Sequence, residues 1–204
     1  MARAVRVAID MNRGDEPLIM EGDTDTLTLD EIIYAKLADA VRMVEMEAPL
    51  FMLESGHDFG EQDIYINKTG KGFIILPDDF MRLIAFRMSD WTRTVYEAIS
   101  ESDPQYALQS SRFKGICGNP EKPVVAIVRR AEGKVLEFYS CKTEEASVAQ
   151  ATYLPIPKID RDGGIDVAED CYRAAVYRAA SLALASVGDQ LSTTMLEISK
   201  SLLQ

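Results

Sequence analysis

The chain has 204 residues, of which 47% are hydrophobic and 27% are charged, and its formal net charge is −11. This length and composition suffice for a buried hydrophobic core and exclude a disordered chain. The acidic surplus excludes binding of nucleic acid through a broad basic surface, because such binding depends on Lys and Arg that displace counterions from phosphates.

The cysteines and the amino terminus bear on the cellular compartment. Cys117, Cys141 and Cys171 are odd in number and widely spaced, which is typical of reduced thiols rather than of a disulfide framework. The amino terminus lacks the apolar core of a signal peptide, and no apolar run approaches the length of about 18 residues that a transmembrane helix needs. We therefore expect a protein with no membrane partner, made in the cytoplasm and either kept there or packed into an assembly formed there.

The amino-terminal region is predicted to be an extended arm. Val5, Val7 and Ile9 recur at every second position, which indicates a short strand or an extended segment. Residues 12–25 are rich in Gly, Asp, Glu and Pro, which favours a loop. We expect residues 1–27 to form an arm that precedes the folded domain.

A long amphipathic helix is predicted to begin after Thr28. Thr28 and Glu31 match a capping box, in which each residue bonds the backbone of the other at a helix start. The apolar positions that follow at helical spacing are Leu29, Ile33, Leu37, Val41 and Val44. Pro49 is expected to end the helix by about residue 48.

The same helix has a second, weaker apolar edge, formed by Ile32, Met43 and Met46. Two interpretations of this edge stay open. It is either partly buried within the monomer or a contact with another subunit, since surfaces that carry methionine pack adaptably against partners. The three residues are candidate interface residues on the second interpretation.

The middle of the chain is predicted to form an antiparallel β region. Residues 64–76 are typical of a hairpin, with a glycine-containing turn over residues 68–72. Residues 80–86 fit the period of a helix and that of a strand, and a brief turn at residues 78–80 followed by a strand is favoured. Another strand is expected over residues 91–99.

The predicted β region continues beyond a short helix, for which Asp103 is the expected cap and Pro104 the expected first residue. A second hairpin is predicted from the apolar segments 124–128 and 135–139. A further strand is expected to end at Tyr153 and the residue after it.

An alanine-rich helix is predicted over residues 167–187, with Asp166 and Glu169 as its capping box. Its expected core face consists of Tyr172, Val176, Ala183 and Val187. A stripe of small residues, Cys171, Ala175, Ala179 and Ser186, would let another helix approach closely, within the same fold or across a subunit boundary. Ala175 and Ala179 are therefore candidate interface residues. Gly188 is expected to end the helix, and a final helix carries Leu191, Met195, Ile198 and Leu202.

These elements predict an α+β fold, in which amphipathic helices pack with an antiparallel β region of several hairpins and an extended amino-terminal arm precedes them. Residues 28–204 are expected to form a single domain, with a long loop inserted in the β region around residues 100–123.

No pattern in the chain predicts catalysis, a cofactor or a metal site. The chain has one histidine, His57, and neither a GxSxG nor an HExxH motif, which disfavours Ser/His hydrolysis and zinc chemistry. Gly70-Lys71-Gly72 lacks the first glycine and the Ser or Thr of a phosphate-binding loop. Asp78 and Asp79 are interpreted as turn or capping residues, because adjacent side chains rarely point into one site. We expect the protein not to be an enzyme.

The order of several short motifs resembles the head-to-tail adaptor proteins of tailed bacteriophages, and most of all the ring proteins of crAss-like phages. The resemblance covers about residues 28–190. Four of these motifs, called the connector motifs below, are residues 76–80 (LPDDF), 90–93 (DWTR), 118–123 (GNPEKP) and 153–157 (YLPIP). An amphipathic helix precedes them, and the alanine-rich helix that closes with Gly188 and Asp189 follows them.

The resemblance implies a structural virion protein that forms a ring, expected to be twelve-fold, between the portal and the tail. Its partners would be copies of itself, the portal protein and other neck and tail rings, assembled in the cytoplasm of the bacterial host. DNA would pass through the lumen with no sequence-specific binding, and an acidic lumen would repel it. The loop around residues 100–123 would contact another ring, with Arg112 and Lys114 facing the partner. The alternatives are another accessory or interaction protein and, less favoured, an enzyme without familiar motifs.

Overall fold

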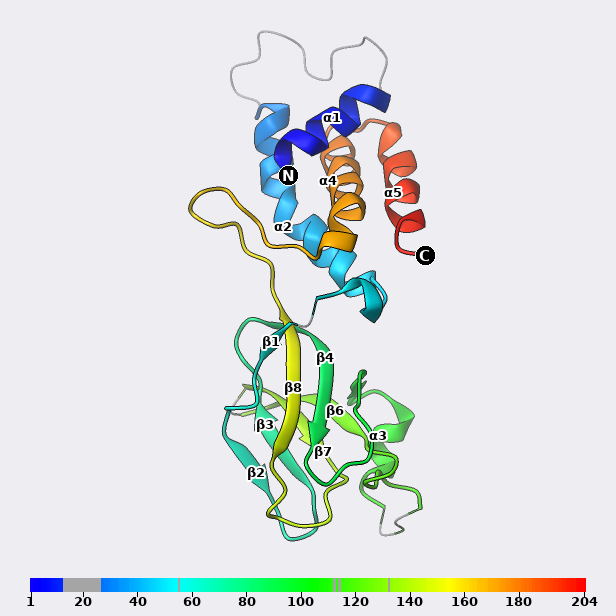
Figure 1. Ribbon diagram of the computed structural model, residues 1–204. Helices are drawn as coiled ribbons and strands as arrows, with labels where there is room; N and C mark the ends of the chain where they lie inside the picture. Colours follow the sequence, from blue (N-terminus) through cyan, green and yellow to red (C-terminus); the bar gives the residue numbers. More distant parts are fainter. Residues whose placement is uncertain (13–26, 55, 112, 114, 132) are drawn as a thin grey trace. The chain divides into compact units, whose positions relative to one another are not determined.

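Five α-helices and two β-sheets form in the described part of the chain (Figure 1). The structure is a computed structural model, and it describes residues 1–12, 27–54, 56–111, 113, 115–131 and 133–204. The chain divides into a helical unit, Met1–Glu54 with Pro157–Gln204, and a β unit, Ser55–Ile156. All strand pairs but one are antiparallel among the described residues, and the predicted α+β class is confirmed.

The amino terminus is a helix, α1 (Ala2–Asn12), so the extended arm predicted there is wrong over these residues. The buried residues Val5, Ala8 and Ile9 recur at helical spacing, and they pack in the core of the helical unit. Arg6 and Asp10 form an ion pair of 3.4 Å along the exposed side. The alternation at positions 5, 7 and 9 misled because Val7 is exposed. The loop predicted over residues 12–25 lies almost entirely outside the described residues.

Helix α2 (Leu29–Glu47) confirms the predicted capping box and core face. The N–H of Glu31 donates to Thr28 Oγ1 at 3.3 Å, and the N–H of Thr28 donates to Glu31 Oε2 at 2.8 Å. All five predicted face residues are buried. The helix ends two residues before Pro49, and a 3-10 turn, η1 (Leu50–Met52), follows.

Helix α4 (Tyr172–Ser186) lies at the centre of the helical unit and contacts α1, α2 and α5 (Leu191–Ser201) (Figure 1). Of its predicted core face, Val176 and Ala183 are buried, whereas Tyr172 is exposed and Val187 is half-buried. The prediction is wrong at these two positions, which are the first residue of the helix and the residue that follows its end. Its buried residues are Ala174, Ala175, Val176, Arg178, Ala179, Ala180, Ser181, Ala183 and Leu184.

The capping box predicted from Asp166 and Glu169 does not form. A 3-10 turn, η2 (Glu169–Cys171), precedes α4, and the residue before it, Ala168, has no side-chain cap. The N–H of Ala168 instead donates to the buried carboxylate of Glu45 on α2, at 3.3 Å. The acceptor at this helix start therefore comes from a distant part of the chain.

The β unit contains two sheets. The first has the strand order β1-β8-β4, and the second has the order β2-β3-β7-β6-β5. The strands are β1 (His57–Asp58), β2 (Ile64–Ile66), β3 (Gly72–Ile75), β4 (Phe80–Met88), β5 (Ile99–Ser100), β6 (Val125–Arg130), β7 (Gly133–Phe138) and β8 (Val148–Pro155). The two predicted hairpins, β2 with β3 and β6 with β7, are confirmed, as is the strand that ends near Tyr153.

One core in the β unit joins residues of both sheets. Its aromatic members are Phe59, Phe80, Phe86, Trp91, Phe138 and Tyr153. The rings lie at stacked and edge-on angles, for example Phe59 over Phe86 with centroids 6.0 Å apart, which is the geometry that aromatic pairs prefer. Burial of these large rings removes apolar surface from water and so contributes to the stability of the unit.

The strand predicted over residues 91–99 is mostly wrong. In this segment the chain makes one bridge, Phe86 with Val95, and enters a sheet only at β5. Trp91 is buried against Phe86, with ring centroids 5.6 Å apart. The N–H of Trp91 donates to the carbonyl of Met88 at 3.1 Å, so the backbone turns here instead of continuing the ladder. The predicted short helix is confirmed as α3 (Pro104–Leu108), where the N–H of Gln105 donates to Asp103 Oδ1 at 2.8 Å.

Candidate functional site

The first and last connector motifs contact each other. The hydroxyl of Tyr153 donates to Asp79 Oδ1 at 2.8 Å, and its ring stacks on Phe80 at 5.5 Å. The N–H of Ile156 donates to the carbonyl of Asp79 at 2.7 Å. Asp79 therefore acts as a tertiary acceptor that joins the start of β4 to the end of β8, in addition to the turn role that the sequence predicted for it.

The two middle connector motifs also contact each other. The N–H and the hydroxyl of Thr92 both donate to the carbonyl of Pro120, at 2.9 and 3.0 Å. Asp90 Oδ2 accepts the N–H of Lys142 at 2.5 Å, which ties the same turn to the chain after β7. The four motifs thus form two contacting pairs, in which Tyr153 and Asp79 bond each other's side chains and Thr92 bonds the backbone of Pro120.

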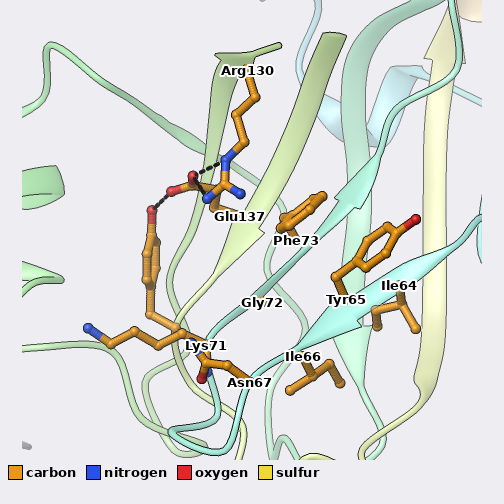
Figure 2. A pocket seen from close by; sticks show the side chains of 10 residues that line it. Ile64, Tyr65, Ile66, Asn67, Lys71, Gly72, Phe73, Arg130 and Glu137 are labelled. Atoms are coloured by element: carbon orange, nitrogen blue, oxygen red, sulfur yellow. Dashed lines mark hydrogen bonds and ion pairs between the residues drawn. The ribbon is translucent and has the colours of Figure 1, made fainter. Parts of the chain in front are cut away.

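A hollow of about 550 Å³ opens on the five-stranded sheet (Figure 2). Residues of β2, β3, β6 and β7 line it, together with the turn between β2 and β3 and Tyr139 after β7. Tyr65 and Phe73 stack at its edge with centroids 4.8 Å apart, and the Arg130 guanidinium lies 4.3 Å from the Phe73 ring centre. An aromatic surface of this kind can contact a ligand or another protein. The polar groups of the hollow determine which chemistry is available there.

The polar groups in this hollow bond one another. Glu137 is 6% exposed, and its carboxylate accepts from Arg130 and from the hydroxyl of Tyr139 (Figure 2). The hydroxyl of Tyr106 on α3 donates to Glu137 Oε2 at 3.2 Å. Each oxygen of the carboxylate is thus engaged, which offsets the free energy of burying its charge.

Burial raises the pKa of Tyr139 far above its ordinary value, and the Glu137 carboxylate raises it further. The pKa of Tyr106 is raised for the same two reasons in the same order. Both hydroxyls therefore stay protonated and act as donors to Glu137 at neutral pH. A nucleophile or a general base would need the opposite shift of the phenol pKa. The phenols and the guanidinium therefore serve to hold the buried carboxylate of Glu137.

The structure places the predicted interface residues in three different environments. Met43 and Met46 are exposed on α2, at 43% and 48%, while Ile32 is partly buried against the core of the helical unit. Ala175 and Ala179 are fully buried within the helical unit, where their small side chains allow close packing. Arg112 and Lys114 lie outside the described residues.

Two of the most exposed aromatic side chains among the described residues were not predicted to be interface residues from the sequence. Phe51 in η1 is 80% exposed, and Phe113 in the segment after α3 is 73% exposed. Near Phe113, Leu108 and Ile116 are about half-exposed. Large apolar groups outside any periodic element were the available signal, since such residues are usually buried in a monomer.

Among the described residues, no group of three or more His, Cys, Asp or Glu side chains is arranged to hold a metal ion. No helix in the same part of the chain is both long and apolar enough to span a bilayer. A scan of protein-family models gives no match to this chain, and neither does a search of curated proteins.

Proposed function

We propose that the chain is a structural ring subunit of the head-to-tail connector of a tailed bacteriophage. In this role it binds copies of itself, the portal protein and other neck or tail rings, in a virion assembled in the host cytoplasm. It acts by shape and contact and transforms no substrate. DNA passes through the ring without sequence-specific binding.

The pairing of the connector motifs is the observation that carries this proposal. Four short motifs at separate places in a chain are weak signals when they are independent of one another. Here the motifs at residues 76–80 and 153–157 bond each other, and so do those at 90–93 and 118–123. Their joint occurrence supports a common architecture with the adaptor proteins that share them.

Exposed apolar side chains support a role in protein contacts. Met43 and Met46 on α2 and Phe51 in η1 leave apolar surface on the helical unit, and Phe113 does so on the β unit. Exposed apolar groups that lie next to one another, as Met43 and Met46 do at helical spacing, are typical of surfaces that a partner covers. A ring subunit needs at least two such surfaces, because each copy contacts a neighbour on either side.

The chemistry of the hollow in Figure 2 is consistent with this role. Its carboxylate, guanidinium and phenols are bonded to one another, and the phenol pKa values are raised. A saturated network of this kind fixes the shape of a surface. It leaves no group among those named that is poised to accept a proton from a substrate.

Native mass spectrometry and electron microscopy of the full chain, alone and with the portal protein of the same phage, test the proposal. The expected result is a closed ring on the portal, and a Met43→Asp/Met46→Asp variant that keeps its circular dichroism spectrum should join it less well. A small complex of fixed low stoichiometry would favour an accessory protein instead. Absence of the chain from purified virions would refute the structural role.

A further inference from the structure

The acidic surplus of the chain is unevenly divided between the two units. The helical unit has 10 Lys and Arg against 19 Asp and Glu, a net charge of −9, whereas the β unit has 12 against 14, a net charge of −2. The acidic surplus therefore belongs mainly to the helical unit.

One exposed segment of the helical unit concentrates this negative charge. Residues 160–170, called the acidic segment below, contain one basic residue, Arg161. Its five acidic residues are all exposed: Asp160, Asp162, Asp166, Glu169 and Asp170. The ion pairs found among the described residues involve none of these carboxylates.

A tight turn presents the first part of the acidic segment. The N–H of Asp160 donates to the carbonyl of Gly164 at 2.8 Å, and the N–H of Gly163 donates to the carbonyl of Asp160 at 2.9 Å. Gly163 has a φ of 76°, which the turn requires and which glycine adopts without strain. The turn therefore holds Asp160 and Asp162 close together in a defined loop.

The β unit carries a hollow lined by positively charged side chains, called the basic hollow below. It has a volume of about 680 Å³, and three lysines, Lys68, Lys71 and Lys142, line it. Further donors are the hydroxyls of Thr69, Ser110 and Ser111 and the side-chain amide of Asn119. The described residues that line it include no carboxylate, which is unusual in a chain of net charge −11.

Backbone contacts fix the walls of the basic hollow. The N–H groups of Thr69 and Lys71 both donate to Asn67 Oδ1, at 2.9 and 3.2 Å, which orders the turn between β2 and β3. The N–H of Cys141 donates to the carbonyl of Gly70 at 3.0 Å. A Cβ on Gly70 would lie 1.9 Å from the Cys141 carbonyl oxygen, so this close approach requires glycine.

The lysines differ in how far they are already engaged. Lys71 Nζ donates to the backbone carbonyl of Gln109 at 2.5 Å, which anchors this side chain and leaves further donors on the ammonium. Lys68 and Lys142 are exposed and form no ion pair with another described residue. These two ammonium groups can therefore bind an anion without breaking an interaction that the structure shows.

We infer that the basic hollow of one copy binds the acidic segment of a neighbouring copy. The inference rests on the proposed function, since a contact between two different surfaces of the same chain is the kind that closes a ring. Two carboxylates in one turn and three more in the same exposed segment match several ammonium and hydroxyl donors in one hollow, through charge-assisted hydrogen bonds. Duplex DNA is the less favoured occupant, because it would need a broad basic surface on a chain that is acidic overall.

A peptide of residues 157–171 tests the contact separately from ring closure. Labelled peptide should bind the full chain at low salt, more weakly as salt rises, and at least about tenfold more weakly to Lys68→Glu/Lys142→Glu. Arg87→Glu/Arg129→Glu, which makes the same change of charge at exposed positions outside the hollow, is the matched control and should bind as the parent does. Circular dichroism establishes that both variants are folded.

Mixing complementary variants tests whether the contact joins two copies. Lys68→Glu/Lys142→Glu alone and Asp160→Lys/Asp162→Lys alone should each assemble poorly on the portal. A mixture of the two should assemble, because each variant then offers its neighbours a matching surface. Rescue only when all four changes are in one chain would place the contact within a single copy and overturn the inference.

Three results of the binding measurements would also overturn it. The peptide could fail to bind, it could bind the hollow variant as tightly as the parent, or a short DNA duplex could bind the hollow while the peptide does not. Rings that form normally from Lys68→Glu/Lys142→Glu would reject this contact and leave the proposed function intact. If the peptide binds the chain but purified virions lack the chain, the contact stands and the proposed function is rejected.

Discussion

The hydroxyl of Tyr153 on β8 donates a hydrogen bond of 2.8 Å to Asp79 at the start of β4. The bond joins residues that are far apart in the sequence, and both belong to connector motifs. Burial raises the pKa of Tyr153 to about 12, and the hydrogen bond to Asp79 and the charge of this carboxylate add to the shift. The phenol is therefore held as a donor over the physiological pH range.

Replacing Tyr153 by Phe should lower the free energy of unfolding of the β unit by about 2 kcal/mol, the typical value for a hydrogen bond to a charged group. The ring stays stacked on Phe80, so the change removes the hydroxyl alone. Urea unfolding at pH 7 measures the loss. Tyr96→Phe, which alters a 56% exposed tyrosine, is the control and should have little effect.

The same bond predicts a pH dependence at the alkaline end. Since the folded pKa of Tyr153 lies above its ordinary value of about 10, its contribution to stability is complete below pH 10. It is lost as the pH rises through about 12. The parent should therefore lose stability more steeply than Tyr153→Phe between pH 10 and 12. Parallel pH curves for the two proteins would contradict the assignment.

Glu45 should make the helical unit less stable as the pH rises from about 4.5 to about 7. Burial raises the pKa of its carboxyl to about 7, while the N–H of Ala168 opposes the shift and the charges of Asp166 and Glu54 add to it. With the folded pKa raised, the stabilising contribution is present below about pH 4.5 and is lost as the pH rises through about 7. The change in the free energy of unfolding is on the order of 3 kcal/mol.

Glu45→Gln tests this assignment, because the amide keeps an oxygen for the Ala168 N–H and cannot ionise. Thermal unfolding between pH 5 and 8 should show a much flatter profile for this variant than for the parent. Asp39→Asn, at an exposed position of the same helix, should keep the parent's slope. If the stability of the parent does not decline over this range, the pKa of Glu45 is not raised in the folded state.

Removal of the Glu47 carboxylate should destabilise the helical unit. Arg178 on α4 is buried, and its guanidinium donates to both oxygens of Glu47 on α2, at 3.0 and 2.6 Å, and to Ser199 Oγ on α5 at 3.3 Å. Glu47→Gln leaves the buried cation with a neutral partner, and the expected loss is about 1–3 kcal/mol. Chemical denaturation measures it.

The complementary change separates the charge from the packing. Arg178→Met removes the cation, so a further Glu47→Gln change in that background should have a much smaller effect. Equal effects of Glu47→Gln in both backgrounds would mean that the ion pair does not contribute. Hydrogen bonding to Arg178 also lowers the pKa of Glu47, so the contribution of the pair should be lost at acid pH as this carboxylate is protonated.

Enlarging the buried alanines of α4 should act on the fold of the helical unit. Ala175 and Ala179 are fully buried, and a leucine at either position has no space without displacement of a neighbouring helix. The expected loss is about 1–3 kcal/mol for each variant. Ala185→Leu, at an exposed position of the same helix, is the matched control. Stable variants that fail only in ring assembly would instead assign these residues to a subunit contact.

The sequence was sufficient where local patterns and tertiary packing agree. The α2 face from Leu29 to Val44, the glycine turn before β3 and the Asp103 cap all form as predicted, because each depends on neighbours along the chain. Helix α1 was missed because Val5 and Ile9 fit two periods equally well. The position of Ala8 in the core decides between the two periods, and a sequence of 11 residues cannot supply that information.

The polar contacts that the sequence did not predict have one physical cause. The carboxylate of Glu45 on α2 accepts the N–H of Ala168, which lies just before η2 and α4. The carboxylate of Glu137 accepts hydrogen bonds from Arg130, Tyr139 and Tyr106. Residues on both faces of β7 are buried, so the alternation that marks a one-sided strand is absent. Long-range polar contacts of this kind leave no local pattern in a sequence.

The pairing of β1 with β8 has a consequence for the order of folding. His57 lies opposite Tyr153, so the points where the chain enters and leaves the β unit are held together. Without this pairing, packing α2 on α4 would close a loop of more than 100 residues, at an entropic cost of roughly 4 kcal/mol. Once β1 and β8 have paired, the two ends of the inserted segment are adjacent, and the loop that α2 and α4 must close is short. Formation of the inserted sheets therefore lowers the entropic cost of bringing α2 and α4 together.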